Sequence, residues 1–285
     1  MKVKICTIVF VVMAVSLAYA GSAAPTFHFF QYPGSMSTHF YGVSNNNVGV
    51  GGYLDSNGAQ HGFMVTQAGK FTTIDNPNGM TYLEGINSSG TIVGYYIDSS
   101  SNYFAFMYVN GVFTNIGPPG GSQTLAFGIN DNGVISGEYL DPTTGMDEGF
   151  TFDGTNYQTV LGPVSGAPAL VYGTNVHGIS TVQWGDSSGN TESSLYNGTA
   201  YKTVNVPGAV DSYIHGIDAA GDAVYSWSDS QGVFHGAALV GGKMTVFDAP
   251  GCTGGTYADS INDHHVIAGV CHVGTSVSKG FYITY

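Results

Sequence analysis

A three-residue fragment recurs six times along the chain at nearly constant spacing. The first residues of the copies are 43, 43, 45, 43 and 44 positions apart. The copies are Gly42-Val43-Ser44, Gly85-Ile86-Asn87, Gly128-Ile129-Asn130, Gly173-Thr174-Asn175, Gly216-Ile217-Asp218 and Ser260-Ile261-Asn262. A fixed period of this length is typical of repeat proteins in which each unit is one supersecondary element. The spacing therefore predicts six equivalent units within a single domain over residues 21–285.

Each unit is expected to contain four strands. In the second unit, residues 83–87, 91–97, 103–108 and 112–116 are short stretches rich in β-branched and aromatic residues. Turn sequences separate them, among them Asn110-Gly111, the dipeptide most typical of a tight hairpin. Four antiparallel strands repeated in this way form a propeller blade, so the sequence predicts an all-β, six-bladed β-propeller.

The two ends of the chain predict how the ring closes. The last unit stops at residues 280–285, which align with the third strand of the first unit, so its fourth strand is missing. Residues 27–34 align with 71–78, the fourth-strand region of the first unit. We therefore expect the N-terminal strand to complete the sixth blade and to remove both open sheet edges.

The first twenty residues have the pattern of a secretory signal peptide. Lys2 and Lys4 precede an apolar run over residues 5–17, and Ala18-Tyr19-Ala20 is a small-residue cleavage site. The apolar run is too short to span a membrane. Cys6 lies within it and not just after a cleavage site, which argues against a lipoprotein anchor. We expect an exported protein, extracellular or periplasmic, without membrane insertion.

The charge balance excludes one class of partner. The chain has 19 acidic residues, six lysines and no arginine, for a net charge of −13. Nucleic-acid binding needs a basic face that neutralises phosphates, so nucleic acid is excluded as a partner. Charged residues make up only 9% of the chain, compared with about 25% in a typical protein. We expect a monomer whose surface is solvated mainly by hydroxyl and amide groups.

A second short motif points to a family. The third predicted strand of the first unit begins with His61-Gly62-Phe63, and the sixth unit has Lys279-Gly280-Phe281 at the equivalent place. Together with the Gly-Ile-Asn fragment, these motifs resemble the bacterial extracellular repeats called HAF. The resemblance covers nearly all of the chain after the signal peptide. It implies an exported bacterial protein, but no particular activity.

Two sets of equivalent residues have both a structural and a functional interpretation. Asp55, Asp98, Asp141, Asp186 and Asp229 recur 13 residues after the start of each unit. They could form a calcium-binding ring, but an aspartate turn that closes each hairpin is favoured. The eleventh position holds Tyr53, Tyr96, Tyr139, Trp184, Trp227 and Cys271. Such rings could stack on sugars, but packing between neighbouring blades is favoured.

The histidines do not predict a metal site. His265 and His272 lie at opposite ends of one predicted strand, roughly 23 Å apart at 3.3 Å per residue, so they cannot share an ion. No His-x-x-x-His or Cys-x-x-Cys spacing occurs. We therefore expect neither a zinc ion nor any other cofactor.

A less regular set of residues is the best candidate for a ligand site. One residue before each repeat start, the units carry Tyr41, Glu84, Phe127, Tyr172, His215 and Asp259. His39 lies two residues before Tyr41. In a propeller these positions belong to the innermost strands, so His39, Tyr41, Glu84, Tyr172, His215 and Asp259 are expected at the channel mouth. Carboxyl and imidazole groups beside aromatic rings suit sugar binding or acid–base chemistry, although polar residues at a wet rim need have no function.

The two cysteines that remain after signal removal are predicted to form a disulfide. Cys252 lies in the loop after the fourth strand of the fifth blade, and Cys271 ends the second strand of the sixth. Both positions belong to the same face of a propeller, in adjoining blades. An even pair in an exported protein is usually oxidised, although two separate buried thiols are the alternative.

Two classes of function remain open. One is a binding or scaffold module for a glycan, a peptide or a cell-surface partner, which is favoured because no nucleophile motif such as Gly-x-Ser-x-Gly occurs. The other is an extracellular hydrolase or lyase with Glu84, His215 and Asp259 as acid, base and orienting group.

Overall fold

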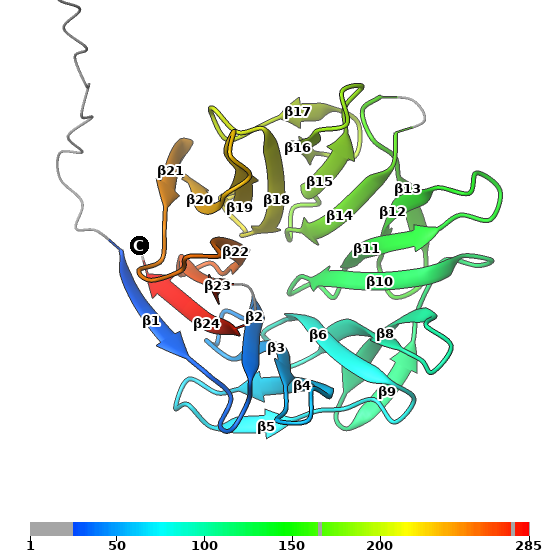
Figure 1. The fold of residues 1–285 in the computed structure, drawn as a ribbon. Helices are drawn as coiled ribbons and strands as arrows, with labels where there is room; N and C mark the ends of the chain where they lie inside the picture. The colour runs from blue at the N-terminus through cyan, green and yellow to red at the C-terminus, as the bar shows by residue number, and fades with distance from the viewer. Residues whose placement is uncertain (1–24, 165–166, 275–276, 285) are drawn as a thin grey trace, which may run out of the picture.

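The computed structural model describes residues 25–164, 167–274 and 277–284, and it is a ring of six β-sheets around a central channel (Figure 1). The predicted signal peptide lies outside the described residues. The strands of the first three blades are β2 (Ser37–Val43), β3 (Gly49–Leu54), β4 (Gln60–Val65), β5 (Phe71–Thr73), β6 (Met80–Ile86), β7 (Ile92–Ile97), β8 (Tyr103–Val109), β9 (Val112–Asn115), β10 (Ser122–Ile129), β11 (Ile135–Leu140), β12 (Asp147–Phe152) and β13 (Tyr157–Val160). The strands of the last three are β14 (Ala169–Thr174), β15 (Ser180–Gly185), β16 (Thr191–Tyr196), β17 (Tyr201–Thr203), β18 (Asp211–Ile217), β19 (Ala223–Ser228), β20 (Phe234–Val240), β21 (Lys243–Phe247), β22 (Gly255–Ile261), β23 (Val266–Val273), β24 (Val277–Thr284) and β1 (Thr26–Phe30).

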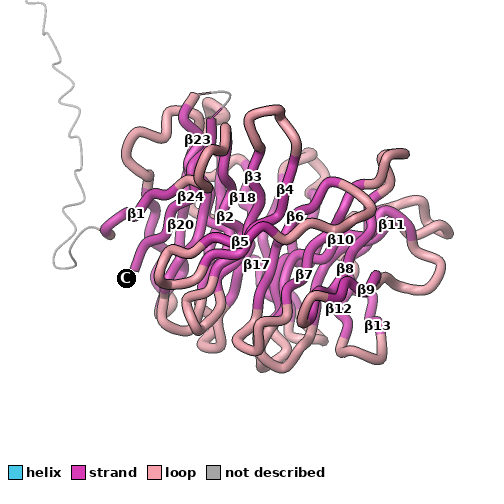
Figure 2. The backbone as a smooth tube through the Cα atoms, turned by 90° about the horizontal axis from the view of Figure 1, so that it is seen from below, coloured by secondary structure: helices cyan, strands magenta, loops and turns pink. Residues whose placement is uncertain are grey.

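This arrangement confirms the predicted six-bladed β-propeller. Each sheet has four antiparallel strands, and the first strand of each unit (β2, β6, β10, β14, β18 and β22) lies nearest the channel. The side view in Figure 2 shows the strands crossing the thickness of the ring, with loops on both faces. The described residues form no helix, so none of them forms a helical membrane span.

Ring closure takes place through the two ends of the chain, as predicted. Strand β1 pairs antiparallel with β24, from Thr26 opposite Thr284 to Phe30 opposite Gly280 (Figure 1). The aromatic side chains of β1 also pack on both neighbouring blades. The ring of Phe27 lies 6.0 Å from that of Phe247 in blade 5, and the ring of Phe30 lies 4.9 Å from that of Phe40 in blade 1. Strand β1 therefore joins blades 5, 6 and 1.

The repeated glycine allows the innermost strands to approach one another. A Cβ atom added to Gly42 would lie 2.6 Å from the carbonyl oxygen of Glu84, and one on Gly128 would lie 2.5 Å from that of Tyr172. Such distances are shorter than real contacts, so larger residues would push neighbouring blades apart. Backbone packing around the channel thus explains most of these glycines, whereas a Cβ on Gly173 would make only ordinary contacts at 3.4 Å and the sixth unit carries Ser260.

The repeated asparagine links each blade to the next. The side-chain amides of Asn87, Asn130 and Asn175 donate to the backbone carbonyl of the equivalent residue one blade on, at 3.2, 3.0 and 3.1 Å. Asn262 donates in the same way to Ser44, at 2.9 Å. The Oδ1 atoms of these asparagines meanwhile accept backbone N–H groups of their own turns. We call this set the asparagine girdle, and it is interrupted where the repeat has Asp218 or Ser44.

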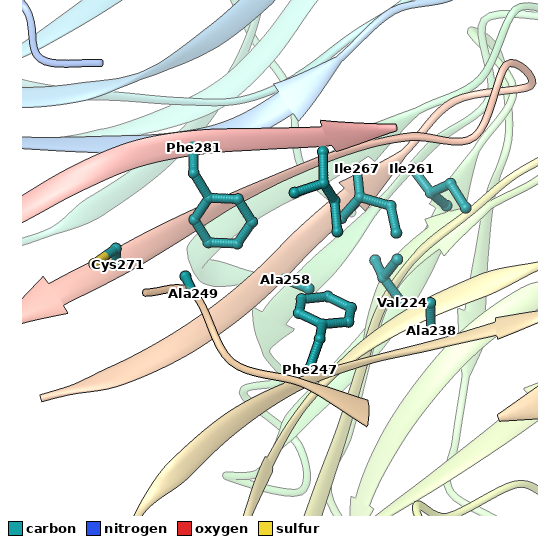
Figure 3. Close-up of a cluster of buried hydrophobic side chains, with 10 residues drawn as sticks. Val224, Ala238, Phe247, Ala249, Ala258, Ile261, Ile267, Cys271 and Phe281 are labelled. Atoms are coloured by element: carbon teal, nitrogen blue, oxygen red, sulfur yellow. The ribbon is translucent and has the colours of Figure 1, made fainter. Parts of the chain in front are cut away.

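The hydrophobic core is divided into six clusters, one in each wedge between neighbouring blades. Figure 3 shows the cluster between blades 5 and 6, where Phe247 approaches Phe281, Ile267 and Ala258. The aromatic positions that could have stacked on sugars mostly serve this packing. Tyr53, Tyr96 and Tyr139 are buried in three of the wedges, as the packing interpretation predicted.

The predicted disulfide is present between Cys252 and Cys271, with their Cα atoms 5.2 Å apart. Cys271 is buried in the wedge between blades 5 and 6, at the position that other blades fill with an aromatic ring. Cys252 packs on the same cluster from the loop between β21 and β22. The bond therefore ties that loop to the second strand of blade 6. A disulfide is consistent with an oxidising compartment.

The recurring aspartates close turns, as the favoured interpretation predicted. The Oδ1 atom of Asp55 accepts the N–H groups of Asn57 and Ala59, both at 2.8 Å, and Asp98, Asp186 and Asp229 show the same pattern. In Asp141 the Oδ1 atom accepts from Thr143 and Thr144. The backbone hydrogen bond from Ala59 is the main influence that lowers the pKa of Asp55. These carboxylates are thus engaged by their own loops.

Candidate functional site

The innermost strands present the candidate residues through a repeated irregularity. In each blade the pairing of the first two strands shifts register at the residue before the repeat start. In blade 2, for example, Leu83 pairs with Gly94 and Gly85 with Val93, so Glu84 is the extra residue of a β-bulge. A bulge changes the direction of one side chain without ending the strand. It explains why a single position lines the channel in five of the six units, His215 of blade 5 being the exception.

Four of the six candidates line one cavity inside the channel. Tyr41, Glu84, Tyr172 and Asp259, together with Phe127, surround a cavity of about 100 Å³. They were expected at the channel mouth, but a further layer of residues, from the turns that follow the repeat starts, lies between them and one face. The side chains are half-buried, and the cavity is partly open to solvent. We call this space the channel cavity.

The two carboxyl groups of the channel cavity hold their protons unusually tightly. Burial, together with the nearby Asp259 carboxyl, raises the pKa of Glu84 to about 8. Burial alone raises the pKa of Asp259 to about 8, and its Oδ2 atom has no hydrogen-bond partner. Two close carboxyl groups in a poorly solvated site cannot both ionise easily. Near neutral pH the pair is therefore at least partly protonated and can donate hydrogen bonds.

The two histidine candidates lie at the edge of this group. His39 exchanges a hydrogen bond of 2.9 Å between its Nδ1 atom and the Tyr41 hydroxyl, and burial lowers the pKa of His39 to about 4. His215 packs edge-on against Tyr172, with 4.8 Å between ring centroids, and burial lowers its pKa to about 4 as well. Both imidazoles are therefore neutral near pH 7. His215 forms no hydrogen bond with Glu84 or Asp259, although all three residues are described.

Sequence reasoning missed a third buried carboxyl group near the channel. Glu138 lies in the second strand of blade 3, and burial together with Asp147 raises its pKa to about 7. Its charge influences Tyr172, whose pKa is raised by burial first and then by Glu138, Glu84 and Asp259. At the equivalent position the second strands of the other blades carry uncharged residues, namely Gly52, Tyr95, Gln183, Ser226 and Val270. That contrast was the available signal.

A larger concave site lies between blades 3 and 4. This inter-blade cleft has a volume of about 260 Å³. Its lining combines amide, hydroxyl and carboxylate groups with three valines and one aromatic ring, Tyr196, from blade 4. The polar members are Asn130, Asn132, Thr151, Asp153, Asn156, Gln158, Thr174, Asn175 and Ser180. No lysine lines it, so its chemistry suits an uncharged, hydroxyl-rich ligand.

An equivalent cleft lies between blades 6 and 1, but its lining has different chemistry. It measures about 310 Å³ and is lined mainly by apolar and aromatic residues, including Phe30, Phe40, Phe71 and Val65. Tyr282 occupies there the place that Thr151 has between blades 3 and 4, since both follow the phenylalanine of the third strand. Equivalent backbone positions thus give one cleft rich in amide and hydroxyl groups and one that is mainly apolar in the same ring.

Comparison with known proteins supports the fold and leaves the family open. The sequence matches no protein-family model, and no curated protein matches it in sequence. Among solved structures, the SapL1 lectin in complex with α-methyl fucoside has a TM-score of 0.56 at 14% identity, covering 88% of this chain and 94% of that one. The fucose-specific lectin from Aleuria aurantia has a TM-score of 0.55 at 9% identity, with coverages of 88% and 93%. Virginiamycin B lyase from Staphylococcus aureus has a TM-score of 0.51 at 12% identity, with coverages of 92% and 100%.

These similarities extend over nearly the whole ring but concern its architecture alone. The chain is a six-bladed β-propeller of the kind found in both carbohydrate-binding proteins and enzymes. Identities this low carry the fold and no particular site, because propellers host many unrelated functions. The function must therefore be argued from the residues of this chain.

Proposed function

We propose that the protein is a glycan-binding module that holds an uncharged sugar in the inter-blade cleft between blades 3 and 4. The observation that carries the proposal is the combination of a cleft of about 260 Å³ with a lining of amide and hydroxyl groups, apolar side chains and a single carboxylate, Asp153. Sugar hydroxyls need donors and acceptors in several directions, and amide side chains supply both. The SapL1 lectin, solved with α-methyl fucoside, supports the proposal because its similar fold holds a sugar.

The free side chains of the cleft strengthen the proposal. Gln158 is exposed, lines the cleft and has no hydrogen-bond partner among the described residues, so its amide is available to a ligand. Thr151 pairs with Gln158 across β12 and β13, and its hydroxyl is likewise available to a ligand. Asp153, by contrast, accepts the N–H groups of Thr155 and Asn156 and serves the turn. Ligand contacts are thus expected from Gln158, Thr151 and the Tyr196 ring.

The channel cavity is a weaker site for a glycan. At about 100 Å³ it is less than half the size of the inter-blade cleft, which itself lies just below the roughly 300–1,000 Å³ of typical small-molecule pockets. The predicted channel residues stay a prediction, now for a smaller ligand: His39, Tyr41, Glu84, Tyr172, His215 and Asp259. Peptide or cell-surface partners remain alternatives for the loop faces. Membership of the bacterial extracellular HAF-repeat family, export and a monomeric state are further parts of this proposal.

A glycan array with the purified protein, followed by calorimetry with the best ligand, tests the proposal. Replacing Gln158 by Ala and Tyr196 by Ala should each weaken binding at least tenfold. Tyr282→Ala in the equivalent apolar cleft is the matched control and should bind like the wild type. Binding that is lost in the control and kept in the two cleft variants would place the site elsewhere, and an array without any bound glycan would reject the proposal.

An enzymatic role is the second candidate, favoured by the protonated carboxyl pair. Glu84 and Asp259 could donate and accept protons near neutral pH, because burial raises both pKa values to about 8. His215 forms no hydrogen bond with Glu84 or Asp259 among the described residues, so it is not placed as the base of a triad. A panel of hydrolase and lyase substrates tests this role. Activity that is lost in Glu84→Gln and in Asp259→Asn would support it, whereas activity unchanged in both would exclude the pair.

A further inference from the structure

Three departures from the repeat pattern meet at one point between blades 5 and 6. The fifth unit has Asp218 where four other units have asparagine. It also has Asp222 where the others carry Val, Thr or Ile, and the sixth unit has His265 where four others carry glycine. In the fold these three side chains converge, and one ligand atom from each lies within 4.8 Å of the other two. Independent drift of three positions would rarely produce such a cluster.

The carboxylate of Asp218 is incompletely satisfied. Its Oδ1 atom accepts the N–H group of Asp222 at 2.9 Å, as the asparagines of the girdle accept from their own turns. Its Oδ2 atom takes the place of the amide nitrogen that those asparagines use to donate to the next blade. That oxygen is buried without a hydrogen-bond partner, and the side chain is only 1% exposed. A buried, unpartnered carboxylate oxygen is costly unless a cation or proton compensates it.

The remaining groups are placed around this oxygen at distances that suit a metal ion. The Nε2 atom of His265 lies 3.5 Å from Oδ2 of Asp218 and 3.1 Å from Oδ2 of Asp222. Ligands held about 2.0–2.1 Å from a tetrahedral zinc ion lie roughly 3.3 Å from one another. The other oxygen of Asp222 accepts the N–H group of Gly241 at 2.8 Å, which fixes the orientation of the carboxylate. Backbone hydrogen bonds therefore orient both carboxylates before any ion binds.

We propose that Asp218, Asp222 and His265 form a binding site for one divalent transition-metal ion, with zinc as the best match. One imidazole and two carboxylates make a mixed nitrogen and oxygen set, which zinc accepts, whereas calcium prefers oxygen ligands alone. The side chain of His265 is 36% exposed, that of Asp222 11% and that of Asp218 1%. This gradient gives an ion a route from solvent and leaves a fourth position for water.

The site would connect two blades at the point where the girdle is interrupted. Asn175 donates to the backbone of Asp218, but Asp218 itself cannot donate to blade 6 as an asparagine would. A metal ion held by two carboxylates of blade 5 and an imidazole of blade 6 would replace that missing link. Asp218 and Asp222 belong to blade 5 and His265 to blade 6, so spacing along the chain does not reveal this cross-blade set.

Other histidines of the protein provide a matched comparison. His61 also lies between two carboxylates, with Nδ1 2.8 Å from Asp75 and Nε2 3.8 Å from Asp55. The two carboxylates there approach opposite nitrogens of the ring, so they do not converge on one point. His61→Asn is therefore a suitable control for zinc binding by surface His–Asp pairs in general.

Calorimetric titration of the full, EDTA-treated protein with zinc chloride, and separately with calcium chloride, tests the proposal. We expect one zinc per chain and at least tenfold weaker binding in Asp218→Asn and His265→Gly. Both substitutions introduce the residue found at that position in most other repeats, so the fold should persist, as circular dichroism can verify. His61→Asn should bind zinc like the wild type.

Two results would overturn the assignment. One is the absence of zinc binding by the wild type at millimolar concentration, which would leave only an ion pair between His265 and the aspartates. The other is zinc binding that survives in Asp218→Asn and His265→Gly. Tighter binding of calcium than of zinc would also contradict the proposed ligand chemistry.

Discussion

The disulfide between Cys252 and Cys271 gives a prediction whose size follows from the chain itself. We consider the substitution Cys252→Ser, which removes the bond but leaves the buried side chain of Cys271 in its wedge. The two residues are 19 positions apart. In the chain-entropy account, closing a loop of this length stabilises the folded state by about 3 kcal/mol. For a domain of this size, a loss of that magnitude lowers the melting temperature by roughly 6–12 °C.

Urea unfolding of the oxidised wild type and of Cys252→Ser measures the difference directly. Adding dithiothreitol should bring the wild type to the stability of the variant and should leave the variant unchanged. Thiol titration of the denatured, unreduced wild type should detect no free thiol. Equal unfolding midpoints for the oxidised wild type and the variant, or two free thiols in the titration, would refute the reasoning.

Two further predictions concern closure and pH. Removing residues 25–34 strips β24 of its partner, so we expect aggregation or a large fall in melting temperature by light scattering and calorimetry, and wild-type behaviour would disprove closure by β1. Glu84 and Asp259 have folded pKa values of about 8. Their contribution to the free energy of unfolding falls as pH rises from about 4 to 8, because the unfolded chain releases those protons first. His39 and His215, with folded pKa values of about 4, act oppositely up to about pH 6.5, and Glu138, with a folded pKa of about 7, adds a smaller fall below pH 7, so the net fall should be steepest between pH 6.5 and 8. Urea midpoints should show that fall in the wild type and much less of it in a Glu84→Gln/Asp259→Asn variant, and an equal fall in both proteins would contradict the assignment.

The sequence predicted the features that depend on periodicity. The positions of the six units, the four strands of each blade and the strand exchange between the termini all follow from spacing and alignment within the chain. The disulfide was also predictable, because strand direction places Cys252 and Cys271 on one face of adjoining blades. Asn47 and His265 stand where other units have glycine, and both adopt positive φ angles of 54°, a conformation that asparagine and histidine tolerate better than most residues.

Features that depend on contacts between blades were harder to predict. The bulge that turns Glu84 toward the channel is a matter of strand register, which the sequence does not show directly. The depth of the candidates along the channel depends on the same register, and the structure places four of them around a cavity next to the turns of one face. The inter-blade cleft and the cluster around Asp218 each combine residues more than forty positions apart or from separate strands. Only the assembled ring brings those residues together.

The closure of the ring by β1 also has a consequence for how the protein folds. Thr26 pairs with Thr284, so the contact that completes blade 6 joins residues from opposite ends of the chain. Contacts of such long range slow folding, because the intervening chain must be ordered or confined first. Until β1 is in place, the outer edge of β24 is open to pairing with another molecule. During synthesis β1 therefore stays unpaired until β24 has been made. The chain is most exposed to aggregation in that interval.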